Sequence, residues 1–255
     1  MRAWVDLNAD GGEGYGAYTI GADVELLKVV SSINVACGFH AGDPVVIRRT
    51  LRAAAAAGVT AGAHPGFPDL QGFGRRAMQI APADLRDMLI YQIGAVAALA
   101  QAEGVPLRHV KAHGALYNMA VSDPGLAGAI AEAAAAFPGL TLFAPLNSAM
   151  AAAASARGVP VVLEAFLDRG YRRDGLLAPR SEPGAVVTDA ALVAARAVQC
   201  AIEGTVTALD GTKITVRPQT LCIHSDTLGA AALARAARQA LEAAGVAITA
   251  PHVAR

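Results

Sequence analysis

Cysteine is scarce in this sequence, and no segment resembles an export signal or a membrane span. The three cysteines, Cys37, Cys200 and Cys222, are odd in number and share no repeated spacing. This argues against a disulfide framework and for a reducing compartment. The start, MRAWVDLNAD, lacks a basic segment followed by an apolar one, and no apolar run approaches the roughly 20 residues of a membrane helix. We therefore expect a cytoplasmic protein that makes no membrane contact.

An excess of either charge is also absent. The chain has 21 basic and 21 acidic residues and a formal net charge of zero, and no stretch of it forms a dense basic stripe. These features argue against binding to nucleic acid or to an anionic membrane. Small molecules and other proteins are the expected partners, and whether the chain forms a homo-oligomer is left open.

Lysine is rare, because arginine supplies most of the positive charge. Only Lys28, Lys111 and Lys213 are present. Lys111 lies between Val110 and Ala112, which favours partial burial over a solvated position. A buried lysine of this kind could hold a substrate carboxylate or phosphate, or stabilise an oxyanion.

Short apolar or β-branched runs alternate with alanine-rich segments along the whole chain. Asp43-Pro44 and Asp123-Pro124 have the form of a helix N-cap followed by proline, and Gly58, Gly104, Gly158 and Gly245 each follow an alanine-rich segment. This rhythm predicts an α/β fold with parallel strands inside helices, closed as a barrel or wound as an open sheet, in one domain over residues 1–255. The seven expected strands lie in residues 3–8, 32–38, 59–64, 108–114, 140–145, 159–166 and 220–225.

Residues 205–216, TVTALDGTKITV, interrupt the rhythm. Their two β-rich halves flank Asp210-Gly211, which is typical of a hairpin with a two-residue turn. We expect this hairpin to precede the last strand and helix.

Polar side chains collect at the carboxyl ends of the expected strands, which meet at one rim in a closed barrel. Asp6, Asn8 and Asp10 alternate along the first strand and share one side, as do Lys111 and His113 on the fourth. Carboxylates, imidazoles and one amine suit general acid–base chemistry, a divalent metal, or both. The strand-end residues are Asp6, Asn8, Asp10 and Glu13; Asn34, Cys37, His40 and Asp43; His64; Lys111 and His113; Glu164, Asp168 and Arg169; and His224 and Asp226.

Some of these residues have a simpler interpretation. Asp43 is expected to cap a helix, and Cys37 to be a small buried filler. Two other histidines, His109 before its strand and His252 near the terminus, are interpreted as structural or solvent-facing. Histidine at three successive strand ends, by contrast, indicates a site formed by His40, His64 and His113.

The segment HPGFPDLQGFGRR, residues 64–76, is too rich in glycine and proline for a helix. We expect it to arch over the barrel mouth, where Phe67 and Phe73 exclude water and Arg75 and Arg76 bind an anion. The alternative is a structural loop with surface arginines. A nucleotide P-loop pattern, GxxxxGK[ST], does not occur in the sequence.

Several long strings, in order along the chain, resemble the LamB/YcsF lactam-utilisation family, the A subunits of 5-oxoprolinase. The resemblance implies a distorted (β/α) barrel of the glycoside hydrolase and deacetylase type. It also implies ATP-dependent hydrolysis of 5-oxo-L-proline to L-glutamate, with magnesium accompanying ATP, together with partner subunits B and C. The strings are DLNADGGEGYG, NVACGFHAGDP, GAHPGFPDLQGFGRR, YQIGA, VKAHGALYN and EAFLDRGY.

The chain departs from the family pattern at two places. Ala112 replaces a proline in VKAHGALYN, and CIHSDTLGA carries Ser225, Thr227 and Leu228 where the family tends toward CVHGDNP. If this last turn touches nucleotide or substrate, the departure bears on specificity.

On this resemblance we assign roles to the rim residues. The catalytic set that surrounds the lactam is Asp10, His40, His64, Lys111 and His113. The expected substrate-binding residues are Asn8, Glu13, Arg75, Arg76, Asp168 and Arg169. Asp10 or Glu13 would activate water, and Arg75 or Arg76 would hold the carboxylate or phosphate. Asp168 and Arg169 would form an ion pair or bind an anion directly. A divalent metal would be held by Asp6, His40 and His64.

Two other functions remain open from the sequence. The chain could be a free-standing metal-dependent deacetylase or glycosidase that needs no ATP. It could also be a non-catalytic component that presents 5-oxoproline to its partners.

Overall fold

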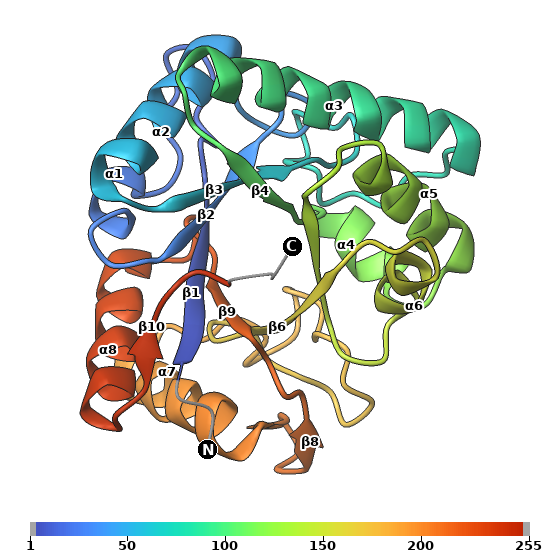
Figure 1. Cartoon of the computed structure of the whole chain (residues 1–255). Helices are drawn as coiled ribbons and strands as arrows, with labels where there is room; N and C mark the ends of the chain where they lie inside the picture. The colour runs from blue at the N-terminus through green and yellow to red at the C-terminus, as the bar shows by residue number, and fades with distance from the viewer. Residues whose placement is uncertain (1–3, 252–255) are drawn as a thin grey trace.

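Seven parallel strands close into a barrel in the computed structural model, which describes residues 4–251 (Figure 1). The ring closes because β1 pairs with β2 on one side and with β9 on the other. All seven expected strands are present, so the predicted barrel is confirmed. Its strands are β1 (Trp4–Gly11), β2 (Ser32–Ala36), β3 (Thr60–His64), β4 (Leu107–Val110), β5 (Thr141–Ala144), β6 (Val161–Phe166) and β9 (Thr220–Ile223).

The helices surround the barrel, as Figure 1 shows. Asp43 and Asp123 are the N-caps of α2 and α5, each accepting two backbone N–H groups, as the sequence predicts. No helix among residues 4–251 is both long and apolar enough to cross a membrane. The helices are α1 (Asp23–Leu26), α2 (Pro44–Ala57), α3 (Pro82–Ala102), α4 (Gly114–Ala120), α5 (Pro124–Ala135), α6 (Ala149–Ala156), α7 (Ala190–Val198), the π-helical turn Gln199–Glu203, and α8 (Ala230–Ala243).

Removal of the α2 cap is expected to lower stability measurably. Asp43 accepts from the N–H groups of Val45 and Val46 and also from Gly16 in the preceding loop. Asp43→Ala should therefore reduce the free energy of unfolding by about 1–2 kcal/mol, as measured by urea denaturation. Asp87→Ala, at an exposed position of α3, is the control and should change it by less than about 0.5 kcal/mol. Equal stability of the two variants would show that the cap contributes nothing.

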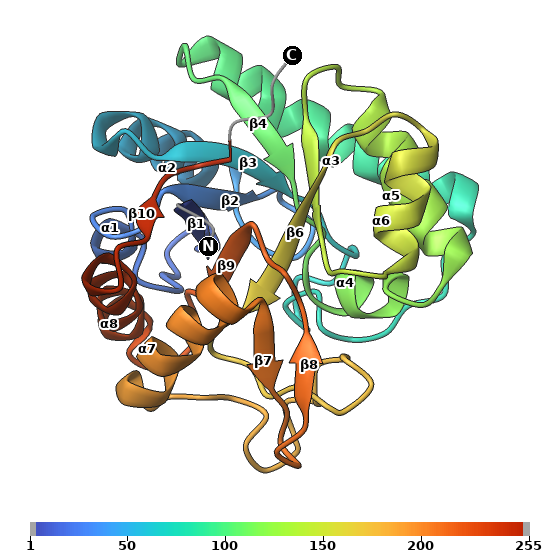
Figure 2. The ribbon, with the colours of Figure 1, turned by 60° about the horizontal axis from the view of Figure 1, so that its bottom comes forward.

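The expected hairpin is present, but its turn is longer than predicted. β7 (Thr205–Thr207) and β8 (Lys213–Thr215) pair antiparallel and project below the barrel in Figure 2. The N–H of Ala208 donates to the carbonyl of Thr212, so the turn has three residues and not two. Gly211 takes a positive φ of 86°, which is typical of a three-residue turn with a bulge. A short strand that the sequence did not predict, β10 (Ala247–Ile248), pairs with the start of β1 outside the ring.

The barrel interior is polar, whereas the apolar core lies between the strands and the helices. Val5, Leu7 and Ala9 of β1 are buried in that core, and the alternate residues Asp6, Asn8 and Asp10 are buried on the other side of the strand. Barrels of this kind usually fill their interior with branched apolar side chains. Here hydrogen bonds take over that role, because a buried polar group is costly unless it is paired.

Two contacts illustrate this packing. Asn34 of β2 donates to the side chains of both Asn8 and Asp10, and His109 of β4 bonds to the amide oxygen of Asn34. His109 is therefore a buried residue within its strand. Its interpretation as structural is confirmed, whereas the expected position before the strand is wrong. His252 lies outside the described residues.

Candidate active site

The carboxyl ends of the strands surround a cavity of about 430 Å³. This volume is in the usual range for small-molecule sites. The charged and imidazole residues of its lining come from six separate segments of the chain, as expected for the rim of a barrel. They are Asp10, His64, Arg75, Lys111, His113, Arg169, Arg180 and His224.

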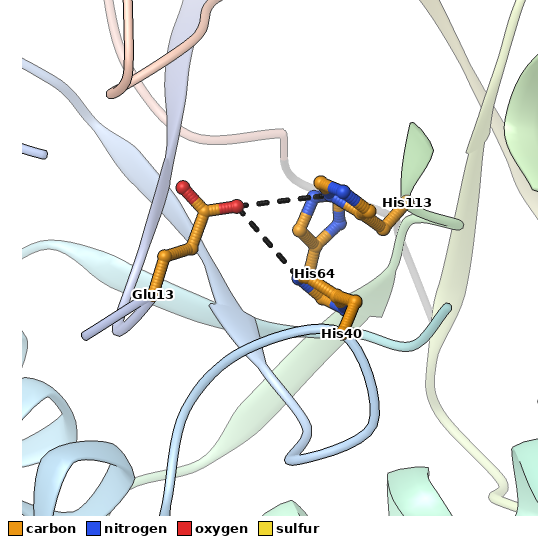
Figure 3. Close-up of side chains that lie close together, drawn as sticks. All are labelled: Glu13, His40, His64 and His113. Carbon is orange, nitrogen blue, oxygen red and sulfur yellow. Dashed lines mark hydrogen bonds and ion pairs between the residues drawn. The ribbon is translucent and has the colours of Figure 1, made fainter. Parts of the chain in front are cut away.

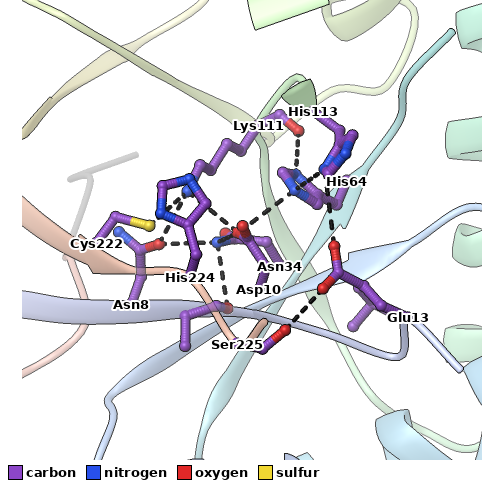
Figure 4. A network of polar contacts seen from close by, with 12 residues as sticks. Asn8, Asp10, Glu13, Asn34, His64, Lys111, His113, Cys222, His224 and Ser225 are labelled. Atoms are coloured by element: carbon purple, nitrogen blue, oxygen red, sulfur yellow. Dashed lines mark hydrogen bonds and ion pairs between the residues drawn. The ribbon is translucent and has the colours of Figure 1, made fainter. Parts of the chain in front are cut away.

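Lys111 lies at the floor of this cavity and is more deeply buried than the sequence suggested. Only 2% of its side chain is exposed. Its Nζ lies 3.2 Å from Asp10 Oδ1 and 2.9 Å from Cys222 Sγ (Figure 4). It also lies 3.0 Å from Glu164 Oε1. Burial acts to lower the pKa of Lys111, but the Asp10 carboxylate, with Cys222 and Glu164, holds it well above its usual value. The ammonium is therefore a fixed positive charge.

Asp10 connects this lysine to His64. Its Oδ1 is 3.3 Å from His64 Nε2, and the other ring nitrogen of His64 donates to the backbone carbonyl of Lys111 at 2.8 Å. Burial acts to raise the pKa of Asp10, yet His64 and Lys111 hold it well below the usual range. Asp10, His64 and Lys111 thus form one connected group, as the strand-end positions predicted.

Next to this group, three histidines and Glu13 converge (Figure 3). Glu13 Oε1 is 3.7 Å from His40 Nε2 and 3.7 Å from His113 Nδ1. Burial, together with the Asp10 carboxylate, raises the pKa of Glu13, and burial lowers the pKa values of His40 and His113. We define Glu13, His40, His64 and His113 as the histidine cluster.

Asp6 is not a member of the histidine cluster. The prediction that its carboxylate joins His40 and His64 in a metal site is therefore wrong. Its oxygens accept from the hydroxyls of Ser31, Ser32 and Thr220 inside the barrel. Burial raises the pKa of Asp6 to about 6. The sequence pattern showed that Asp6 faces inward, but the rise along the strand places it two side-chain layers below Asp10.

The loop of residues 65–76 covers the histidine cluster, as expected. A Cβ on Gly66 would lie 3.0 Å from His40 Nδ1, and one on Gly74 would lie 2.7 Å from His113. The glycines therefore allow the backbone to contact the imidazole rings directly. Phe73 packs edge-on against His113, and its carbonyl accepts from the ring of that histidine. Phe67 is fully buried in the apolar core and does not shield the mouth as predicted.

The two adjacent arginines of this loop differ in position. Arg75 lines the cavity, lies over the Phe73 ring and makes a bidentate pair with Asp226. Arg76 has a side chain 64% exposed and pairs with Asp69 of its own loop. It is absent from the cavity lining, so of the two arginines only Arg75 faces the cavity.

Asp168 and Arg169 form no ion pair with one another in the described part of the chain. Asp168 bonds instead to the ring of His224 at 2.9 Å and accepts from the hydroxyl of Thr227. Arg169 donates to the carbonyls of Ala178 and Ala185 and lines the cavity. Burial and the neighbouring Arg180 lower the pKa of Arg169 to about 10. Arg169 thus remains a candidate for binding an anion, and Asp168 positions His224.

Besides Asp6, Arg76 and Asp168, three more predicted residues lie outside the cavity lining: Asn8, Glu13 and His40. Asn8 donates to Glu164 and Thr220 below Lys111. His40 is stacked on His113 with ring centroids 3.7 Å apart. Their roles are therefore to support or position the groups that line the cavity.

Four residues of the site received no role from the sequence: Glu164, Cys222, His224 and Arg180. Glu164 and His224 were visible as strand-end residues, but their partners could not be read without the register between strands. Arg180 gave no signal, because it lies in an irregular segment after β6. At the turn that departs from the family pattern, Ser225 donates to Glu13, so this turn contacts the site.

Comparisons with known proteins agree with this geometry. The LamB/YcsF family profile matches residues 5–254. The chain is 53% identical over 247 residues to the A subunit of 5-oxoprolinase from Thermus thermophilus, covering 96% of this chain and 99% of that protein. It is 50% identical to the protein of the same name from Heliobacterium modesticaldum, with 96% and 97% covered. The crystal structure of the lactam utilization protein from Thermus thermophilus superposes with a TM-score of 0.91 at 52% identity, covering 96% of this chain and 99% of that chain. The chain therefore belongs to the LamB/YcsF family.

Proposed function

We propose that this chain is the A subunit of a 5-oxoprolinase, and that it acts with subunits B and C to hydrolyse 5-oxo-L-proline to L-glutamate at the expense of ATP. The observation that carries the proposal is the high identity, over nearly the whole chain, to relatives that bear the name of the 5-oxoprolinase A subunit. The cavity supports it, because it combines anion-binding arginines with a carboxylate, a histidine and a lysine.

The cationic part of the lining suits the carboxylate of 5-oxoproline. Arg75, Arg169 and Arg180 all line the cavity. Arg75 and Arg180 both pair with the carboxylate of Asp226. Guanidinium groups bind carboxylate and phosphoryl groups through paired hydrogen bonds, so these three side chains suit a substrate carboxylate or a phosphoryl group.

ATP is proposed as a co-substrate, with magnesium, on chemical grounds. An unstrained five-membered lactam is a resonance-stabilised amide and a poor electrophile. Transfer of the terminal phosphoryl group to the lactam oxygen activates the ring carbon. Water then adds there and the C–N bond breaks, which leaves an acyl phosphate at the former ring carbon. A second water hydrolyses this acyl phosphate, so that glutamate, phosphate and ADP result.

The floor of the cavity supplies groups for the hydrolytic step. Lys111 presents a fixed positive charge that stabilises negative charge on the lactam oxygen or its phosphoryl group. Asp10 lines the cavity and is held ionised, so its carboxylate can orient a water molecule and accept its proton. His224, held by Asp168, faces the same cavity and can donate a proton to the departing nitrogen.

The neighbouring arginines provide a matched test of the proposed carboxylate contact. Arg75→Met should raise the KM for 5-oxoproline by roughly 10–100-fold in the assembly with subunits B and C, because a charged hydrogen bond is lost. Arg76→Met, which removes a pair between an exposed guanidinium and Asp69 outside the cavity, should leave KM within about twofold. Glutamate formation at varied substrate concentration measures both. Equal KM values for the two variants would refute the proposed binding mode.

A further inference from the structure

The four side chains of the histidine cluster are buried and offer ligand atoms to one point. Glu13 follows β1, His40 follows β2, His64 ends β3 and His113 follows β4. One ligand atom from each lies within 4.8 Å of all the others. Four separate segments of the chain therefore deliver a carboxylate and three imidazoles to a dry site.

Hydrogen bonds to the backbone fix where two of the imidazoles carry their protons. His64 Nδ1 lies 2.8 Å from the carbonyl of Lys111, and His113 Nε2 lies 2.8 Å from the carbonyl of Phe73. A carbonyl only accepts, so these nitrogens are the protonated ones in the neutral rings. The bare nitrogens, His64 Nε2 and His113 Nδ1, then face each other at 3.0 Å. Two lone pairs at this distance repel unless a cation lies beside them.

The other two members add further polar atoms that have no partner. Glu13 Oε1 and both ring nitrogens of His40 are buried without a hydrogen bond to any of residues 4–251. The second oxygen of Glu13 accepts from Ser225, which orients the free oxygen toward the histidines. Leaving such atoms unpaired in a folded interior costs about 1–3 kcal/mol each. The cluster thus lacks positive charge at its centre.

The spacing of these atoms fits a transition-metal ion. Zinc binds nitrogen and oxygen ligands at about 2.0–2.1 Å, so tetrahedral ligands are separated by about 3.3 Å. The corresponding distances here are 3.0 Å between His64 and His113, 3.7 Å between Glu13 and His113, and 3.7 Å between Glu13 and His40. The two backbone carbonyls are the kind of outer partner that orients metal-bound histidines.

The stacking of His40 on His113 determines which side chains can bind the metal ion without moving. Their rings are parallel within 3°, so an ion in the plane of His113 lies outside the plane of His40. His40 makes no hydrogen bond that a tilt would break. His64, His113 and Glu13 are therefore the primary ligands, and His40 completes the set by tilting.

We propose that Glu13, His40, His64 and His113 form a binding site for a single divalent transition-metal ion of the zinc type. The site adjoins the cavity, because His64 and His113 belong to the cavity lining as well. The alternative occupant is a proton on His64 Nε2, shared with His113 Nδ1 at 3.0 Å and Asp10 Oδ1 at 3.3 Å.

Cobalt binding to the isolated full-length chain, first stripped with chelator, tests this proposal without 5-oxoproline or ATP. We expect one cobalt ion per chain, visible absorption bands of four-coordinate cobalt, and displacement of the cobalt by one equivalent of zinc. An absence of cobalt bands at millimolar cobalt would mean that a proton alone occupies the cluster, and would overturn the proposal. Because no turnover is measured, this result is separate from the fate of the proposed 5-oxoprolinase activity.

Variants locate the ion. Glu13→Gln and His64→Ala should each weaken cobalt binding at least 100-fold, and Glu13→Gln keeps the size of the side chain if His64→Ala fails to fold. His224→Gln is the matched control, because His224 belongs to a second group of ligand atoms with Asp10 and Cys222. It should leave affinity within about twofold. Loss of binding in His224→Gln with retention in Glu13→Gln would place the ion elsewhere and refute the site.

Discussion

Lys111→Met is expected to lower kcat of the assembled 5-oxoprolinase by about 10²–10³-fold, the usual effect of removing a group that stabilises charge in the transition state. The side chain lies at the cavity floor between the carboxylates of Asp10 and Glu164. Methionine has a similar length but no charge. Because the proposed role concerns the reacting oxygen, kcat should fall even at saturating 5-oxoproline.

The same substitution should lower stability. Without the ammonium, the buried carboxylates of Asp10 and Glu164 lose their common partner, and breaking a buried ion pair costs about 3–5 kcal/mol. Lys28→Met is the control: Lys28 is exposed and pairs with Glu25 one turn away, so its loss should change stability by less than about 0.5 kcal/mol. If folded Lys111→Met retained a kcat within twofold of the original protein, the chain would present substrate to its partners and would not itself catalyse.

Gly62→Ala is expected to reduce the free energy of unfolding by about 3 kcal/mol or more, a large effect for one methyl group. A Cβ at this position would lie 2.1 Å from Cδ2 of His109. The ring cannot move aside easily, since it stacks on Phe143 at 4.1 Å and bonds to Asn34. Any displacement also disturbs the hydrogen bond from Asn34 to Asp10. Thermal or urea unfolding measures the loss.

Gly94→Ala provides a control of opposite sign. Gly94 lies within α3, where a Cβ would meet only Phe137 at 3.6 Å, an ordinary contact. Alanine is favoured over glycine in a helix by about 0.5–1 kcal/mol, so this variant should be slightly more stable. A Gly62→Ala protein as stable as Gly94→Ala would contradict the tight polar packing of the barrel interior.

The strands and helix caps could be predicted from the sequence because their signals are local. β-branched runs, Asp-Pro caps and glycines after alanine-rich segments each act within a few residues. The predicted two-residue turn of the hairpin was wrong, because the pattern around Asp210-Gly211 fits turns of two or three residues. The strand β10 has two residues, which is too short to show the alternation of apolar and polar residues that marks a strand.

The members of the site were partly predictable, and their pairing was not. Alternation along β1 correctly placed Asp6, Asn8 and Asp10 on one side, but height along the barrel depends on the register between strands. That register decides that Glu13, and not Asp6, meets the histidines. Likewise, Cys222 is 111 residues from Lys111, and no local pattern indicates their contact.

The central claim is that this barrel mouth opens the lactam ring within a 5-oxoprolinase. The most direct measurement is glutamate formed from 5-oxoproline by the chain assembled with subunits B and C, with and without ATP. We expect glutamate only when the assembly is complete and ATP is present. If the intact assembly with ATP forms no glutamate, the proposed substrate is wrong.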